Sequence, residues 1–295
     1  MFKKGFIAVE IIAVAFVALI GGLAGTSAYF KNGQSAQEKS AAAVNTSIVM
    51  IDETFALDPI IARGTYGGID WTLTEAGLLT IKPSLNPVAD SVSGKVYASG
   101  EWREAVVYDK NGNPKSIGGY PYNVNSVKSL VIEEGVTFIG SFAAQFPNLT
   151  GEVIIPSTVT YIGQEAFQKT KITQLTFAAG GTEKLCVGPG AFKNMIIEMI
   201  AFPEDRPEIH IHCWAFNNST KLKTVIFPAN ITTFSKWTHV EYAGMGTVDS
   251  NDSQLFKGAS SLKTVIFGSQ EVRDLFYNSP NNSKYMTNVE VIIQE

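Results

Sequence analysis

The chain has 295 residues and a formal net charge of −4, with 17% charged and 45% hydrophobic residues. This length allows one large or two modest domains beside a targeting segment, and the even spread of apolar residues argues against a disordered stalk. No basic block follows the short amino-terminal leader, so nothing indicates a nucleic-acid partner.

The amino-terminal end is a short basic leader followed by an apolar run. Lys3 and Lys4 precede Gly5, and the run from Phe6 to Phe30 contains a single charge, Glu10. About 20 apolar residues suffice to span a bilayer. A carboxylate in such a segment costs roughly 2.5–3.5 kcal/mol at the helix centre and less near an end. Glu10 is therefore expected to have a specific partner.

The order Lys-Lys-Gly, Phe, and Glu at the fifth position after the glycine resembles the class III leader of type IV pilins and pseudopilins. The resemblance implies that prepilin peptidase cuts between Gly5 and Phe6 and that the new amino terminus is methylated. It implies that Glu10 then meets the amino terminus of a neighbouring subunit, so that the chain associates with itself or with other pilins through its amino-terminal helix.

Two other interpretations of this segment stay open. The run from Phe6 to Phe30 is long enough for an uncleaved signal anchor, or it could be a secretory signal cleaved near Ala28. The secretory signal fits poorly with Glu10 and with so long a run. In the pilin and the anchor, the two leader lysines hold the amino end in the cytoplasm. We then expect a precursor in the inner or cytoplasmic membrane and a head at the cell surface or on an extracellular filament.

Residues 6–58 are predicted to form a long helix, because the stretch after the apolar run is rich in Ala, Gln, Glu and Lys. Asp58 precedes a proline, which disfavours further helix. Residues 64–125 are predicted to be a β-rich lead-in. In it, Trp71–Thr74 and Leu78–Ile81 flank a turn and form a predicted hairpin.

A second hairpin turn is predicted at Asn111-Gly112. The surrounding Asp109-x-Asn-x-Asn113 spacing could also hold calcium, but the glutamate that completes a calcium loop is absent. A plain turn is the favoured interpretation.

Residues 126–295 contain an internal repeat. The segment Leu130–Gly140 aligns with Val153–Gly163, and the hexapeptide Leu-Lys-Thr-Val-Ile-Phe occurs at both 222–227 and 262–267. Ala-Phe pairs recur at 166–167, 191–192 and 215–216, and Leu255-Phe256 replaces the pair once. A period of about 23–25 residues is typical of leucine-rich repeats. Stacked coils about 4.8 Å apart would share one apolar core and a parallel ladder of strands.

The pattern Ile155-Pro-x-x-Val-Thr-x-Ile-Gly-x-x-Ala-Phe167 resembles the BspA-like leucine-rich repeats of bacterial surface antigens, and Trp71–Ile81 resembles the lead-in that precedes such arrays. The resemblance covers roughly residues 68–295 and implies surface exposure with adhesion or partner binding. The chain departs from the pattern at Ala144, where the aromatic is missing, and in an insertion at Ser235–Gln254. The expected fold class is α+β, with a long amino-terminal helix, a small β-rich lead-in and a β-rich leucine-rich-repeat solenoid.

The insertion is the candidate binding loop for an unknown surface ligand, because it carries Trp237, His239 and Tyr242 on a scaffold of otherwise tight coils. Alternatively, these aromatics fold back over the apolar groove. Cys186 and Cys213 allow one disulfide, and the alternative is a pair of buried thiols.

No enzymatic motif is present: the sequence has no Gly-x-Ser-x-Gly, Walker loop or dinucleotide fingerprint. His210 and His212 share one face of a predicted strand, where an exposed face is favoured over a metal site. We therefore expect no catalytic, cofactor-binding or metal-ligating residue. The sequence predicts a pilin-like surface protein that forms or decorates a type IV-type filament. The alternative is a membrane-anchored surface binding protein with no filament.

Overall fold

The computed structural model describes residues 58–89, 97–102, 106–108, 114–117, 122–141, 143–235 and 253–294. The predicted residues Gly5, Phe6 and Glu10, and the predicted helix up to residue 57, lie outside these ranges. Among the described residues, no helix has the length and apolarity needed to cross a membrane.

The described elements follow one another as short strands with few helical turns. The strands are β1 (Ile60–Tyr66), β2 (Ile69–Thr74), β3 (Leu78–Pro83), β4 (Glu101–Trp102), β5 (Val106–Tyr108), β6 (Pro114–Ile117), β7 (Ser129–Ile132), β8 (Phe138–Ile139), β9 (Thr150–Ile155), β10 (Tyr161–Ile162), β11 (Lys171–Phe177), β12 (Leu185–Val187), β13 (Met199–Ala201), β14 (Ile209–His212), β15 (Thr224–Phe227), β16 (Ile231–Ser235), β17 (Thr264–Phe267) and β18 (Glu290–Ile293). The helical elements are η2 (Val124–Ser126), α3 (Gln270–Asn278) and η3 (Ser283–Tyr285).

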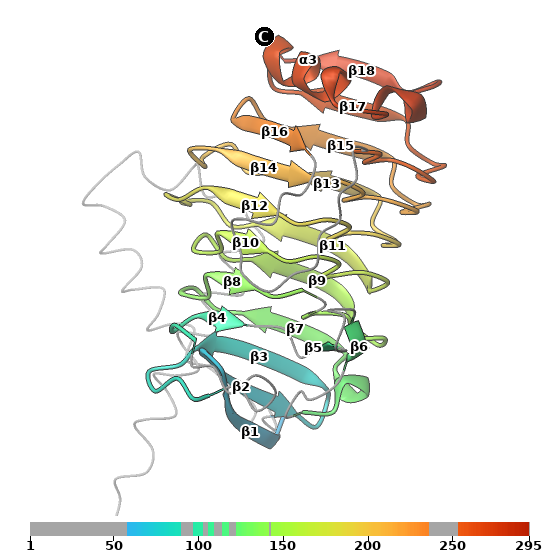
Figure 1. Ribbon diagram of the computed structural model, residues 1–295. Coiled ribbons are helices and arrows are strands. Elements are labelled where there is room, and N and C mark those ends of the chain that lie inside the picture. Colours follow the sequence, from blue (N-terminus) through green and yellow to red (C-terminus); the bar gives the residue numbers. More distant parts are fainter. Residues whose placement is uncertain are drawn as a thin grey trace, which may run out of the picture. The chain divides into compact units, whose positions relative to one another are not determined.

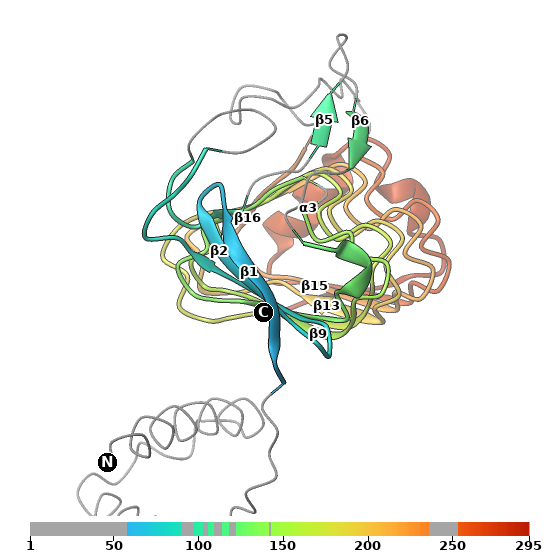
Figure 2. The same cartoon turned by 90° about the horizontal axis from the view of Figure 1, so that it is seen from below.

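From β7 onward most repeats contribute one strand to each of two parallel walls. The first wall contains β3, β7, β9, β11, β13, β15, β17 and β18. The second wall contains β4, β8, β10, β12, β14 and β16. Figure 1 shows the strands of each wall stacked in sequence order, and Figure 2, turned by 90°, shows the coils lying over one another around a common interior. The predicted β-rich leucine-rich-repeat domain with parallel sheets is confirmed.

The interior is filled by the aromatic residues of the Ala-Phe turns and by aliphatic residues of both walls. Phe192 lies between Phe167 and Phe216, with ring centroids 6.1 and 5.8 Å apart, and Phe216 lies 5.6 Å from Phe256. All four rings are almost fully buried. The predicted register of the repeat is therefore confirmed, because the aromatic of each turn occupies the same level of its own coil.

Phe146 compensates for the missing aromatic at Ala144. The backbone N–H of Ala144 donates to the Ala166 carbonyl, as the N–H of Phe167 does to Ala191, so Ala144 occupies the position of the ladder phenylalanine. Two residues later, the buried ring of Phe146 stacks on Trp102 at 6.2 Å. The first coil thus fills its interior from a shifted position.

The lead-in strands join the same walls as the repeats. The predicted hairpin is confirmed, because β2 and β3 pair antiparallel through a turn in which Gly77 has a φ of +96°. β3 then pairs with β7 and β4 with β8, both in parallel. Strands β5 and β6 also pair antiparallel, while the predicted turn between them, at residues 109–113, lies outside the described residues.

The helix α3 covers the interior at the carboxy-terminal end, as Figure 1 shows in red. Ser269 is its N-cap, with Oγ accepting from the Val272 N–H at 3.3 Å. The buried ring of Phe276 lies 5.4 Å from both Phe234 and Phe267. The aromatic ladder therefore ends against a helix, and β18 follows as the last strand of the first wall.

Candidate functional site

The two ends of the insertion are described, although Trp237, His239 and Tyr242 lie outside the described residues. The chain leaves at the end of β16 and is described again from Ser253. The Ser253 carbonyl accepts from the Trp214 N–H at 2.8 Å, and its own N–H donates to Pro280 at 3.0 Å. The Leu255 N–H donates to Oδ1 of the buried Asn282 at 3.1 Å. The returning end is thus bonded both to the preceding coil and to the carboxy-terminal segment.

Trp214 marks this corner and was not identified from the sequence. It precedes the Ala-Phe pair of its coil, a position at which Glu165, Gly190 and Gln254 stand in other coils. All four have positive φ, between +35° and +61°. A left-handed conformation costs a residue with a Cβ roughly 1–2 kcal/mol. The signal that could have found Trp214 is a large aromatic at a position where other coils carry a polar residue or glycine.

Cys186 and His212 come together across neighbouring coils of the second wall. Cys186 Sγ lies 3.3 Å from His212 Nε2, and His212 is only 7% exposed. The prediction of an exposed strand face is therefore wrong for His212. The described residues contain no group of three or more histidine, cysteine or acidic side chains that could hold a metal ion.

Cys186 and Cys213 are both buried thiols and are not joined as a disulfide in the structure. Register explains why the disulfide that the sequence allows does not form. Cys186 pairs with His210, and Cys213 follows three residues beyond it, which is about 10 Å along an extended chain. A disulfide requires Cα atoms closer than about 7 Å.

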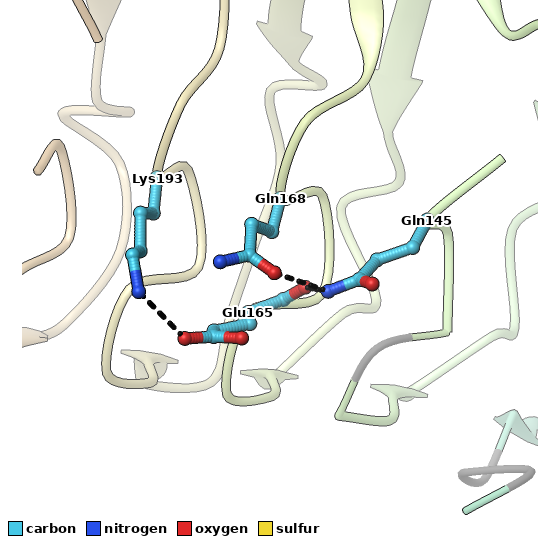
Figure 3. A network of polar contacts seen from close by, with 4 residues as sticks. All are labelled: Gln145, Glu165, Gln168 and Lys193. Atoms are coloured by element: carbon cyan, nitrogen blue, oxygen red, sulfur yellow. Dashed lines mark hydrogen bonds and ion pairs between the residues drawn. The ribbon is translucent and has the colours of Figure 1, made fainter. Parts of the chain in front are cut away.

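Polar side chains form hydrogen bonds and an ion pair between successive coils, along the turns that carry the Ala-Phe pairs (Figure 3). Gln145 Nε2 donates to the Glu165 carbonyl at 2.8 Å and to Gln168 Oε1 at 3.0 Å. Lys193 Nζ lies 3.1 Å from Glu165 Oε1. The network links three coils and keeps their register, and it contains no pairing of nucleophile and base that would support catalysis.

Charged groups also join coils at the corner where the first wall meets the second. The carboxylate of Glu134 accepts from the Ser157 N–H at 2.8 Å, the Ser157 hydroxyl at 2.9 Å and the Thr158 N–H at 3.2 Å. Partial burial acts to raise the pKa of Glu134, but these hydrogen bonds outweigh burial and hold the pKa below its usual value.

Arg206 lies at the same corner and is buried. Its guanidinium donates to the carbonyls of Glu183 and Pro156 at 3.2 and 3.4 Å. Burial lowers the pKa of Arg206, and the nearby Asp205 and Glu134 partly oppose that effect. Gly181 leaves room for the side chain, because a Cβ there would lie 2.1 Å from Arg206 Nε. The corner is a structural connection between coils.

The outer face of the first wall carries a line of aliphatic side chains, which we call the aliphatic row. Its strongly exposed members are Val131, Ile154 and Ile292, at 45%, 50% and 38%. Ile226, Ile266 and Ile292 lie side by side in the parallel register of β15, β17 and β18, and Ile226 and Ile266 are partly exposed. Thr176 lies beside Ile154 and interrupts the row, so its exposed apolar surface falls into two groups. Exposed apolar surface of this kind can mark an interaction site. The aliphatic row can make non-covalent contacts with a partner.

The family comparison agrees with this architecture. The model of the BspA type leucine rich repeat region matches in six copies, over residues 115–239 and 185–293. The chain belongs to the BspA type leucine-rich-repeat family. No curated protein matches the sequence.

Solved structures of leucine-rich-repeat proteins are similar to this chain. One from Eubacterium ventriosum is 21% identical over 70% of this chain and 44% of its own, with a TM-score of 0.45. One from Bacteroides ovatus is 19% identical over 78% of this chain and 76% of its own, with a TM-score of 0.30. A leucine rich cell surface protein from Faecalibacterium prausnitzii is 14% identical over 72% of this chain and 97% of its own, with a TM-score of 0.20. The chain thus spans less than half the length of the Eubacterium ventriosum protein.

Proposed function

We propose that this chain is a pilin-like surface protein that displays a leucine-rich-repeat head for adhesion or partner binding. The observation that carries the proposal is the order of two patterns in one chain. A leader with Gly5, Phe6 and Glu10 in the pilin arrangement precedes a head built of BspA type repeats. The first pattern supplies export and assembly, and the second supplies a surface that is open to a partner.

The geometry of the head favours binding over catalysis. Most of its large apolar side chains are buried in the core between the stacked coils. What the scaffold leaves for a partner is the aliphatic row and the insertion between Ser235 and Ser253, whose returning end is firmly bonded. Long excursions from a repeat scaffold often form its binding face.

The assembly step of the proposal rests on Glu10. In a bundle of apolar helices its carboxylate has little water to solvate it, so it needs a cation or a hydrogen-bond donor. The amino group that prepilin peptidase would create at Phe6 of a neighbouring subunit supplies both. The subunit would be inserted in the membrane as a precursor and would then assemble into the filament with its head outside the cell.

The second candidate is a membrane-anchored surface binding protein with no filament. The run from Phe6 to Phe30 supports it, because this run is long enough to span a bilayer without any further partner. Both candidates place the head outside the cell, and they differ in the role of Glu10.

Thiol labelling of intact cells tests the shared part of the proposal. The chain has two cysteines, both buried in the head, so the wild type provides a low background. Met199→Cys places a thiol at a residue that is 57% exposed, and Val225→Cys places one at a fully buried residue. We expect a membrane-impermeant maleimide to label intact cells carrying Met199→Cys but not Val225→Cys. Labelling of Met199→Cys only after lysis would place the head inside the cell and overturn the proposal.

A further inference from the structure

Strand β18 leaves one edge of the first wall open. The Glu290 N–H donates to Lys263 at 2.7 Å and the Gln294 N–H donates to Phe267 at 2.8 Å, so these groups face β17. Backbone groups of alternate residues point to opposite sides of a strand. The N–H and C=O groups of Val291 and Ile293 therefore point away from β17, where no strand pairs with them within the described ranges. Figure 1 shows β18 at the end of its wall.

The side chains of β18 are also incompletely covered. Val291 and Ile293 lie in register with Val265 and Phe267, which are fully buried, yet both are only partly buried. On the outer face, Ile292 ends the aliphatic row and is 38% exposed. Among the described residues, the edge therefore offers unpaired backbone groups together with apolar surface on both faces, a combination that favours addition of another strand.

The sequence of β18 is self-complementary in the antiparallel direction. With Ile292 opposite Ile292 of a second copy, Val291 lies opposite the partner's Ile293 and can exchange both backbone hydrogen bonds with it. The twofold symmetry repeats this pair, so four bonds form. Glu290 then lies opposite the partner's Gln294, so no like charges meet. A parallel partner at this edge would lack this twofold repetition.

We propose that β18 is a dimerisation edge that pairs antiparallel with β18 of a second copy of this chain. The pairing joins the four-stranded sheets of β13, β15, β17 and β18 of two heads into one continuous sheet through an isologous contact. It also covers the exposed parts of Val291 and Ile293 and joins the two aliphatic rows. Because a four-residue strand buries less than the roughly 1,200–2,000 Å² of a standard stable interface, the dimer should form in a concentration-dependent way. Crowding of copies on one surface raises the effective concentration.

Cysteine cross-linking of the full-length chain in detergent tests the register. In the proposed pair Ile292 faces its own copy at a position without mutual hydrogen bonds, where Cβ atoms lie about 4.5–5.5 Å apart. Ile292→Cys should then form an intermolecular disulfide under mild oxidation. Thr264→Cys is the matched control, because it lies on the same outer face one strand inward, three strand spacings from its own copy. Thr264→Cys should not cross-link. The native cysteines are buried and should not form intermolecular disulfides.

Replacing Gln294 by a charged residue should leave the fold of the head unchanged, because this side chain is exposed. In the Ile292→Cys background, Gln294→Lys places a cation opposite the partner's Glu290 and should raise the yield of cross-linked dimer. Gln294→Glu places two like-charged pairs in the interface and should lower the yield several-fold. Val291→Pro removes an outward N–H and spares the ladder to β17, so it should also lower the yield.

Three results would overturn the proposal. Thr264→Cys could cross-link as readily as Ile292→Cys, Ile292→Cys could fail to cross-link at high protein concentration, or the Gln294 variants could leave the yield unchanged. Association through the amino-terminal segment alone would bring copies together without producing the difference between residues 264 and 292. The result is therefore separate from the test of filament assembly.

Discussion

The rings of Phe192 and Phe216 stack with centroids 5.8 Å apart and planes 18° from parallel, although the residues belong to different coils. Each ring stands after an alanine at the same point of its repeat. Because the ring of each coil packs against the rings of the neighbouring coils, no coil can bury its apolar residues alone. The stability of the head should therefore depend on each ring of this ladder.

Emptying the ladder at Phe192 should destabilise the whole head. Phe192 is fully buried, so Phe192→Ala is expected to cost on the order of 3–5 kcal/mol in the free energy of unfolding. Met199→Ala, at a residue that is 57% exposed, is the control and should change it by less than about 0.5 kcal/mol. Chemical denaturation of residues 58–295 measures both. We expect this fragment to be soluble and β-rich. Equal denaturation midpoints for Phe192→Ala and Met199→Ala would show that the aromatic ladder does not stabilise the stacked coils.

The two cysteines should behave as buried thiols. Native protein is expected to react very slowly with a thiol reagent, and two equivalents should react once the chain is denatured without reductant, because Cys186 and Cys213 are buried and not bridged. Mass spectrometry under the same conditions should show the two hydrogens that a disulfide would lack. Fewer than two reactive thiols after denaturation would contradict the register that separates these residues.

Glu134 should make stability depend on pH in the acidic range. Its pKa is lower in the folded state than in the unfolded chain, so its contribution is fully present above the unfolded value and is lost as pH falls through the folded value. Glu134→Gln is expected to lower the free energy of unfolding by less than about 1 kcal/mol at neutral pH, since the group is largely exposed. This difference should vanish in strong acid. Glu133→Gln removes the same charge from the adjacent exposed residue and is the control, and an equal effect from it would exclude the role of the Ser157 and Thr158 bonds.

The solenoid and its register could be predicted because each depends on residues spaced by the repeat itself. The hairpin of β2 and β3 could be predicted for a similar local reason, since Gly77 supplies its left-handed turn. The helix α3 lies within the range predicted as solenoid and was not predicted, because the repeat pattern gives no helix signal there and the Ser269 cap is only a local one.

Features that depend on contacts between coils could not be predicted. The buried His212 contacts Cys186, which lies 26 residues earlier and meets it only when two coils are stacked. Phe146 fills the space left by Ala144 from a position that no repeat alignment marks. For the candidate site, the insertion could be located from the sequence. The hydrogen bond from the Trp214 N–H to the Ser253 carbonyl could not be predicted, because it forms between two stacked coils.

Glu10 should matter for assembly and not for folding of the head. Glu10→Leu makes the predicted amino-terminal helix more apolar, so the subunit is expected to stay in the membrane while losing the proposed contact with the amino group of a neighbour. The measurement compares sheared surface filaments with the membrane fraction for the wild type and Glu10→Leu. Loss of filaments with intact, membrane-held protein is the expected result. Normal filament yield from the variant would remove the proposed role, and a non-filamentous anchor predicts no effect.

The amino terminus of the mature protein tests the pilin-like assignment most directly. Mass spectrometry of the protein recovered from cells should find a chain that begins at Phe6 and carries one methyl group on its terminal nitrogen. An intact Met1 would contradict the assignment and leave an uncleaved anchor. A chain beginning at Tyr29 would contradict it as well, by showing that the apolar run is a secretory signal that is removed before the head reaches the surface.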